Sequence, residues 1–206
     1  ESFTETTEGF IAYIAESFFE EVPLYKTLNG FPEVKMEYAV EKEEDQNWNE
    51  TWEKNFSPIT IGDACHIRAT FHPEQVVFPY EIVIDPKMSF GTGHHQTTMM
   101  MVQLALECDF NDKVVLDMGA GTAVLAILAA MKGASDLTAI DIDEWAYNNA
   151  IENVALNGFP NIEMLMGGAE LLGAKSFDLI FANINRNILL QDISAYAEVL
   201  KPEGKL

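Results

Sequence analysis

Short apolar runs alternate with amphipathic stretches from residue 95 to the end of the chain. The runs V-V-L-D, L-T-A-I-D and D-L-I-F-A-N are apolar almost throughout, whereas the stretches between them repeat apolar residues every three or four positions. The first pattern is typical of buried parallel strands, and the second is typical of helices that cover them. The pattern predicts an α/β domain with a parallel-rich sheet. Its strands are Lys113–Asp117, Leu137–Asp141, Asn161–Met166 and Phe177–Ala182, and its helices are 95–107, 122–132, 144–157 and 187–200.

The first 45 residues have a different pattern. Ser2–Glu8 and Phe10–Glu16 read as two strands, and Ser17–Asn29 has helical spacing. Val34–Val40 alternates like a further strand. This order matches the last two-thirds of a ferredoxin-like unit, so residues 1–45 are predicted to form a small, partial α+β domain.

A charged connector separates the two regions. Residues 46–56 carry Trp48, Trp52 and Phe56 at helical spacing, which predicts a linker helix whose aromatic residues pack onto a domain. Residues 57–206 then form the second domain. Its first strands are predicted at Pro58–Ile61, His66–Phe71 and Tyr80–Ile84.

The sequence ends on K-P-E-G-K-L, directly after the last predicted helix. A Pro-Glu-Gly turn in this position normally leads into another strand. Four strands of the main sheet are predicted, where such a sheet usually has six or seven. We therefore expect the chain to be truncated at both ends, with its C-terminal strands missing.

The stretch V-V-L-D-M-G-A-G-T-A-V-L ends a strand, turns on two glycines and begins a helix. Gly119 and Gly121 allow a sharp turn close to a ligand, and the helix N-terminus offers free N–H groups. The dinucleotide pattern G-x-G-x-x-G fails, because its third glycine would be Val124. The S-adenosylmethionine pattern (D/E)-x-G-x-G-x-G fits, with Ala123 in place of the last glycine. Asp117 suits a cofactor that carries an ammonium and a sulfonium.

Two polar residues follow the second and fourth strands of the main sheet. Asp141 lies close to the spacing of roughly 20 residues after Asp117 that is expected for an acid binding both ribose hydroxyls. Asn183 faces the crevice outside the carboxyl ends of the strands, where the transferable methyl is expected. The segment N-I-N-R lacks the Asn-Pro-Pro-Tyr of adenine-N6 and glutamine methyltransferases. Asp143 and Asn185 are predicted to cap helices.

The stretch F-G-T-G-H-H-Q-T-T, residues 90–98, directly precedes the strand–helix region. This position predicts that it lies over the methionine end of the cofactor. Phe90 begins the loop, Gly91 can turn its N–H toward a carboxylate, and Thr98 adds a hydroxyl. No metal site is predicted, because no further His, Cys or acid lies at ligand spacing from the two histidines.

The net charge is −21, from 12 Lys and Arg against 33 Asp and Glu. This charge disfavours direct nucleic-acid binding and suits a basic protein partner, although acidity that only aids solubility is an equally open interpretation. No run of 18 apolar residues occurs, so no membrane span is expected. Cys65 and Cys108 form no CxxC pair, which favours free thiols and a cytoplasmic protein.

Taken together, F-G-T-G-H-H-Q-T-T, V-V-L-D-M-G-A-G-T-A, A-I-D-I-D and F-A-N-I resemble the ribosomal-protein methyltransferases of the PrmA type, over nearly the whole chain. The resemblance implies a Rossmann-like class I methyltransferase that uses S-adenosyl-L-methionine. It implies methylation of amines, of lysine and of the N-terminus, on protein eleven of the large ribosomal subunit. Residues 1–45 would recognise the substrate and residues 46–56 would be a hinge. The implied cofactor contacts are Thr98, Gly119, Asp141 and Asn183.

Methyl transfer to an amine is an in-line displacement at the sulfonium carbon, so the protein mainly aligns the partners and excludes water. Asn183 is the candidate catalytic residue, since its side-chain or main-chain oxygen can orient the amine. Two alternatives stay open: a class I methyltransferase for another protein, an RNA or a small molecule, and a non-catalytic fragment that binds the cofactor. A monomer is expected.

Overall fold

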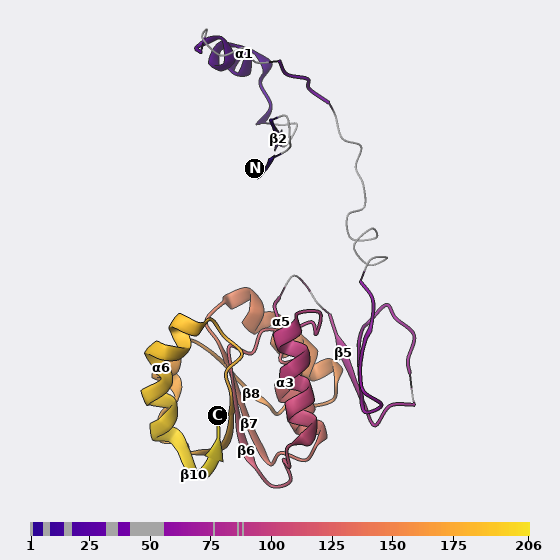
Figure 1. The fold of residues 1–206 in the computed structure, drawn as a ribbon, viewed down its shortest axis with the longest axis vertical. Coiled ribbons are helices and arrows are strands. Elements are labelled where there is room, and N and C mark those ends of the chain that lie inside the picture. Colours follow the sequence, from indigo (N-terminus) through magenta and orange to yellow (C-terminus); the bar gives the residue numbers. More distant parts are fainter. Residues whose placement is uncertain are drawn as a thin grey trace. The chain divides into compact units, whose positions relative to one another are not determined.

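The computed structural model of the 206-residue chain describes residues 2–5, 9–14, 18–31, 37–41, 56–75, 77–85, 87 and 89–206. Contacts between Cα atoms divide the chain into two compact units, residues 1–47 and 48–206 (Figure 1). The predicted linker helix at residues 46–56 lies outside the described residues, apart from Phe56.

The first unit contains two strands and a helix in the predicted order. Strands β1 (Ser2–Glu5) and β2 (Phe10–Tyr13) pair antiparallel, and α1 (Glu21–Asn29) follows. Helix α1 starts later than predicted, which places Pro23 in its first turn, where a proline removes no helical hydrogen bond. The strand predicted at Val34–Val40 lies partly outside the described residues, and residues 37–40 form no strand.

Five parallel strands form the central sheet of the second unit, in the order β10-β9-β6-β7-β8. Strands β7 and β8 follow β6 on one side of it, and the next strands in the chain, β9 and β10, lie on its other side. This reversal creates a crevice at the carboxyl ends of β6 and β9, which is where ligands of such sheets bind. The strands are β6 (Val114–Met118), β7 (Asp136–Asp141), β8 (Glu163–Met166), β9 (Phe177–Phe181) and β10 (Leu200–Lys205).

The fifth strand, β10, was not predicted. The sequence predicts a turn at Pro202 and Gly204, with a strand that only begins after it. In the structure this segment itself pairs with β9, in an irregular register. The other four strands of this sheet are confirmed to within two residues of their predicted bounds.

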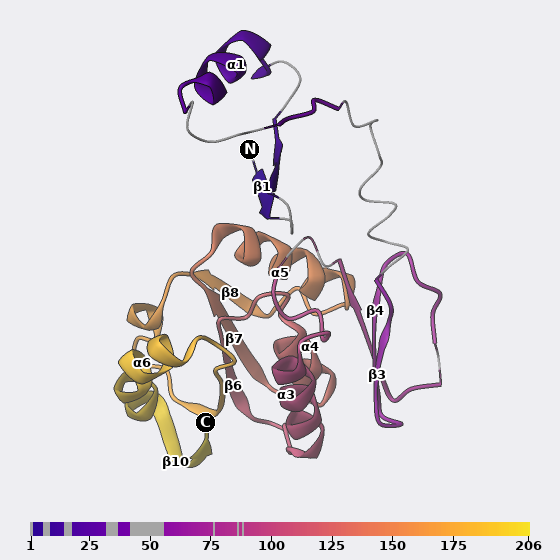
Figure 2. The same cartoon turned by 45° about the horizontal axis from the view of Figure 1, so that its top comes forward.

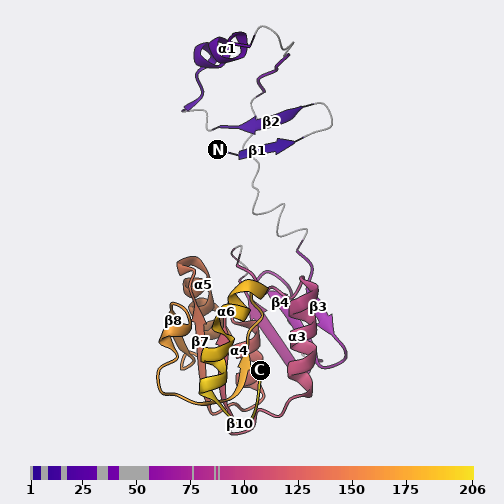
Figure 3. The same cartoon turned by 60° about the vertical axis from the view of Figure 1, so that its left-hand side comes forward.

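Helices cover both faces of the five-stranded sheet. Val115 of β6 packs into one hydrophobic cluster and the next residue, Leu116, packs into a second one on the opposite face. Figure 1 shows the strands between α6 and α3, and in Figure 3, which is turned toward α6, this helix lies in front of the sheet. The first face is covered by α3 (Gln96–Glu107), α4 (Val124–Met131) and α5 (Glu144–Leu156). The second face is covered by α6 (Arg186–Val199) and the short 3₁₀ helix η2 (Ala169–Leu171).

A separate three-stranded sheet precedes α3. Strands β3 (Ile59–Ile61) and β4 (Cys65–Ala69) pair antiparallel, and β4 pairs parallel with β5 (Tyr80–Ile84). Figure 2 shows this sheet on the side of the domain that carries α3 and α4. Its buried isoleucines, such as Ile67 and Ile82, join the same hydrophobic cluster as these helices, so the two sheets share one core.

Three of the helices of the second unit begin at a side-chain cap. His95, Asp143 and Asn185 each accept a backbone N–H of the first turn of α3, α5 and α6, which confirms the two predicted caps of α5 and α6. Helix α4 has no such cap. It follows Ala123, whose φ of 61° lies in the left-handed region. The helix therefore starts at Val124, two residues later than predicted.

Candidate functional site

The loop that begins at Phe90 lies directly on the glycine turn that follows β6. The carbonyl oxygen of Phe90 accepts the N–H of Thr122 at 2.9 Å, and that of Gly91 accepts the Thr122 hydroxyl at 2.8 Å. A Cβ atom on Gly121 would lie 2.2 Å from the carbonyl oxygen of Phe90. The approach of the two backbones therefore requires glycine at position 121, and Thr122 joins the loop to the turn.

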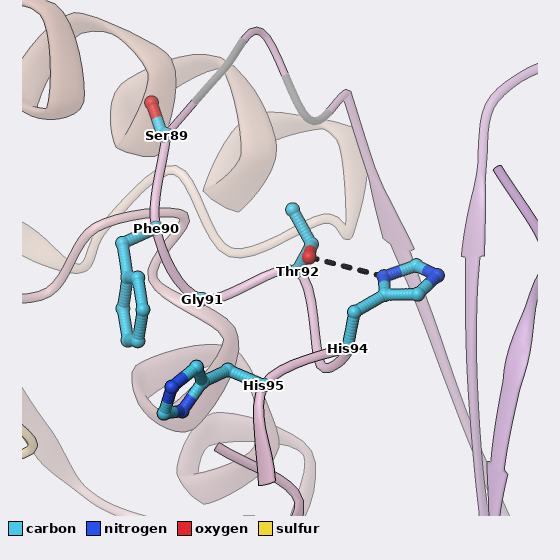
Figure 4. A pocket seen from close by; sticks show the side chains of 6 residues that line it. All are labelled: Ser89, Phe90, Gly91, Thr92, His94 and His95. Atoms are coloured by element: carbon cyan, nitrogen blue, oxygen red, sulfur yellow. Dashed lines mark hydrogen bonds between the residues drawn. The ribbon is translucent and has the colours of Figure 1, made fainter. Parts of the chain in front are cut away.

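The loop also lines a pocket of about 460 Å³, shown in Figure 4. Phe90 and His95 extend to one side of the loop, with ring centroids 5.2 Å apart. His94 extends to the other side, where its ring lies 4.4 Å from that of Phe56. Two of the predicted cofactor residues, Phe90 and Gly91, thus line this pocket. Its full lining is Ser89, Phe90, Gly91, Thr92, His94 and His95.

Asp141 closes β7 beside the same glycine turn. Its Oδ2 accepts the N–H of Gly121 at 2.8 Å, and its Oδ1 accepts the N–H of Asp143 at 3.0 Å. The residue is 9% exposed. The acid at the end of the second strand and the turn after the first strand are therefore in direct contact, and the carboxylate lies at the carboxyl edge of the sheet.

Asp117 has a different environment from Asp141. Its Oδ2 accepts the N–H of Ala126, in α4, at 3.1 Å, and the residue is 2% exposed. Burial raises the pKa of the Asp117 carboxyl to about 7; the Ala126 hydrogen bond opposes this rise and the charge of Asp141 adds to it. The Asp117 carboxyl is thus buried and hydrogen-bonded to helix α4, and its contact with the cofactor stays a prediction.

Thr98 and Asn183 meet although 85 residues separate them in the chain. The amide Nδ2 of Asn183 donates to the hydroxyl of Thr98 at 3.4 Å, and Thr98 is 1% exposed. Asn183 follows β9, and the next residue, Ile184, reaches the turn: a Cβ on Gly119 would lie 2.2 Å from Cγ2 of Ile184. The segment after β9 therefore lies against the turn, at the point where the strand order reverses.

The glycine turn is consequently contacted from three directions, by the loop at Phe90, by Asp141 and by Ile184. No local pattern in the sequence marks Thr122 or Ile184, because their contacts join segments that lie far apart in the chain. Among the residues that the structure describes, no group of three or more His, Cys, Asp or Glu is arranged to hold a metal ion.

A parallel sheet whose strand order reverses, a glycine turn after its first strand and an acid after its second are shared by dinucleotide-binding domains and class I S-adenosylmethionine-dependent methyltransferases. Val124, in place of the third glycine of the dinucleotide pattern, favours the methyltransferases. The chain matches the ribosomal protein L11 methyltransferase (PrmA) family over residues 5–206. It belongs to this family, as the resemblance implied.

Individual relatives agree with this assignment. The chain is 50% identical to the ribosomal protein L11 methyltransferase of Phocaeicola vulgatus and 47% identical to that of Bacteroides fragilis, in each case over 100% of this chain and 75% of the relative. The crystal structure of a ribosomal protein L11 methylase from Lactobacillus delbrueckii subsp. bulgaricus is 33% identical, with a TM-score of 0.65 over 72% of this chain and 77% of that one. The predicted fold class and family are confirmed.

Proposed function

We propose that the chain transfers methyl groups from S-adenosylmethionine to amines of ribosomal protein L11, including lysine and N-terminal amines. The family and the names of its relatives support this substrate. The observation that carries the proposal is the convergence of the loop at Phe90, the carboxylate of Asp141 and the segment after β9 on one glycine turn. S-adenosylmethionine, when bound, supplies a methyl group already activated on a sulfonium.

The chemistry of the turn fits this cofactor better than a dinucleotide. Asp141 lies beside the turn, and its charge would repel a diphosphate but attract an ammonium and a sulfonium. Each oxygen of Asp141 has a second lone-pair site besides the one used by a backbone N–H, so the carboxylate can also accept two ribose hydroxyls. Gly119 and Gly121 are the proposed cofactor contacts of the turn, where the lack of a Cβ admits Ile184 and the Phe90 carbonyl, and Asp117 accepts an N–H of the first turn of α4.

The remaining proposed contacts lie at the methionine end. Phe90 and Gly91 line the pocket of the loop, and Thr98 contributes the hydroxyl at the start of α3. Because the Nδ2 of Asn183 donates to Thr98, its Oδ1 is the end of the amide that is available to accept an N–H of the substrate amine. We assign Asn183 the role of orienting the amine for in-line attack.

The amine must be neutral to attack. An exposed lysine has a pKa near 10.4 and an α-amine near 7.7–8.0. A site that excludes water lowers these values, because burial disfavours the charged form. The role of the protein is therefore to orient and desolvate the amine.

Partner and domain roles belong to the same proposal. The net charge of −21 suits a basic ribosomal protein and opposes direct nucleic-acid contact. Residues 1–45 would recognise the substrate and residues 46–56 would act as a hinge, in a monomeric, cytoplasmic enzyme. Of the helices that the structure describes, none is long and apolar enough to cross a bilayer.

The experiment that tests the catalytic role is Asn183→Ala, assayed with labelled S-adenosylmethionine and purified ribosomal protein L11. Loss of the orienting oxygen is expected to lower kcat by about 100-fold. Asn185→Ala is the matched control, because Asn185 caps α6 through the N–H of Asn187 and its loss should reduce stability without reducing transfer. Wild-type turnover in Asn183→Ala would overturn the assigned role.

Ligand binding and methyl labelling distinguish the proposed function from the alternatives, which are another substrate or a fragment that only binds the cofactor. Calorimetry should show that the wild-type chain binds S-adenosylhomocysteine and not NAD. Binding without label in ribosomal protein L11 would favour either another substrate or a fragment that only binds the cofactor. Binding of NAD instead would overturn the cofactor and the enzyme class together.

A further inference from the structure

Helix α5 and the residue that caps its C-terminal end, Asn157, carry three asparagines on one face. Asn149, Asn153 and Asn157 are spaced four residues apart, which aligns them along the helix. Asn149 is 2% exposed and Asn153 is 0% exposed. Asparagine is a poor helix former, and burying its amide is unfavourable unless its polar atoms are hydrogen-bonded. These positions therefore require partners, and the structure supplies them.

The partners are backbone groups of β5 and the residue that follows it. Asn157 accepts the N–H of Val83 at 2.9 Å and donates to its carbonyl at 2.6 Å. Asn153 accepts the N–H of Asp85 at 2.7 Å, and Asn149 donates to the carbonyl of Asp85 at 2.7 Å. Strand β5 pairs with β4 along its other edge. The amides of α5 thus take the place of a neighbouring strand.

Asn153 differs from the other two asparagines because it also contacts the glycine turn. Its Nδ2 donates to the carbonyl oxygen of Thr122 at 3.1 Å. The N–H and hydroxyl of Thr122 in turn bind the carbonyls of Phe90 and Gly91. The buried side-chain amide of Asn153 therefore links Asp85, the residue after β5, to the glycine turn. The loop at Phe90 is bonded to the same turn.

The segment between these two points is held on α5 as well. The indole Nε1 of Trp145 donates to the carbonyl of Lys87 at 2.6 Å, and the Lys87 ammonium pairs with Glu152. Of the described residues, Val83, Asp85 and Lys87 are therefore bonded to α5 or its C-terminal cap, and Phe90 and Gly91 are bonded to Thr122. The position of the loop is set by α5 as much as by the turn itself.

We propose that Asn153 is a positioning residue for the cofactor: by linking Asp85 to Thr122, it holds the loop at Phe90 in register with the glycine turn. This inference rests on the proposed function, because it takes the loop and the turn as parts of the cofactor site. Asn153 acts through Thr122 and the loop. Asn157 makes equivalent contacts with β5 but none that reaches the turn, so it supplies the matched comparison.

The test compares Asn153→Asp, Asn153→Leu and Asn157→Leu in the whole chain. Asn153→Asp keeps an acceptor for Asp85 but places a carboxylate oxygen opposite the Thr122 carbonyl. Both Asn153 variants are expected to raise the Kd for S-adenosylhomocysteine by about tenfold or more, since small misplacements of a binding group have large effects. Asn157→Leu should lower stability to a similar degree as Asn153→Leu and leave the Kd unchanged.

Amide hydrogen exchange provides a second measurement that does not depend on activity. In Asn153→Asp, the amide of Thr122, which donates to the Phe90 carbonyl, should exchange faster, while that of Val83, which donates to Asn157, stays protected. The inference would be overturned if all three variants kept the wild-type Kd, or if Asn157→Leu lost as much affinity as the two Asn153 variants. If Asn153→Leu does not fold, Asn153→Asp and Asn153→Ser decide the question by the same two measurements. Failure of the wild-type chain to bind S-adenosylhomocysteine would instead overturn the proposed function.

Discussion

The N–H of Gly121 donates a hydrogen bond of 2.8 Å to the carboxylate of Asp141. The acid proposed to bind the ribose thus also fixes the glycine turn, so the two parts of the site are not independent. A change at Asp141 removes a ligand contact and releases the turn at the same time.

Asp141→Ala is expected to raise the Kd for S-adenosylhomocysteine by about 10- to 100-fold, because hydrogen bonds to a charged group contribute about 1.5–3 kcal/mol. Asp141→Asn should lose less, since it keeps one acceptor. The control is Asp143→Ala, which removes the cap of α5 and should lower Tm while leaving the Kd unchanged. Calorimetry that finds the same Kd for Asp141→Ala and Asp143→Ala would contradict the ribose role.

Asp117→Asn is expected to change how stability depends on pH. Burial raises the pKa of the folded-state carboxyl to about 7, whereas an exposed aspartate has a pKa of about 3.9. The folded state therefore binds the proton more tightly than the unfolded state, and wild-type stability falls as pH rises from about 4 through about 7. The amide cannot ionise, so at about pH 8 the variant should be more stable by on the order of 2–4 kcal/mol.

Urea unfolding of both proteins between about pH 3 and about pH 8 measures this difference. Asp178→Asn is a control of opposite sign, because hydrogen bonds from Lys201 and from the Val114 N–H lower the pKa of Asp178. Asp178→Asn should lower the free energy of unfolding at neutral pH. The loss should become smaller as the pH falls below the pKa of the aspartate in the unfolded state. A stability difference for Asp117→Asn that does not vary with pH would show that the Asp117 carboxyl titrates normally.

Gly121→Ala and Gly62→Ala form a matched pair. Both glycines have a φ of 56°, but a Cβ at Gly62 meets nothing within 4 Å, whereas at Gly121 it lies 2.2 Å from the Phe90 carbonyl oxygen. Gly62→Ala should lose only the roughly 1–2 kcal/mol of a left-handed alanine. Gly121→Ala should lose more and also displace the loop, which weakens binding of S-adenosylhomocysteine. Equal unfolding free energies and equal affinities would contradict the close approach.

Thr122→Val tests the hydrogen bond from the Thr122 hydroxyl that connects the turn to the loop. Thr122 is 0% exposed, and valine has nearly its shape but leaves the Gly91 carbonyl without the hydroxyl donor. The expected loss of stability is about 1–3 kcal/mol, together with weaker binding of S-adenosylhomocysteine. Thr122→Ser keeps the donor and should retain most of the affinity. If serine is as damaging as valine, the threonine methyl matters and the hydrogen bond does not.

The strands and helices of the second unit were predictable because most of them have a regular apolar spacing. The main errors have local causes. Helix α4 starts after Ala123, since that residue adopts a left-handed conformation that the apolar pattern alone does not indicate. Strand β10 was missed because Pro202 and Gly204 resemble a turn, and the strand indeed pairs irregularly.

The positions of Gly119, Gly121 and Asp141 at the carboxyl edge of the sheet were predictable, because a short pattern marks them, and their contact with the cofactor stays a prediction. The direction of the Asp117 carboxyl was not predictable, because the last residues of a strand can face either a crevice or a covering helix. Contacts made by Thr122 to Gly91 and by Asn153 to Thr122 each join residues 31 positions apart. Such pairs have no signature in a single sequence, so only the folded arrangement identifies them.

The asparagines of α5 also have a consequence for self-association. A strand with unpaired N–H and C=O groups along one edge is a template on which other copies of a chain can assemble. At Val83 and Asp85 this edge is occupied by side chains of the same molecule. The protection depends on a few amides and not on a continuous ladder, so single substitutions there would favour aggregation of an otherwise well-packed domain.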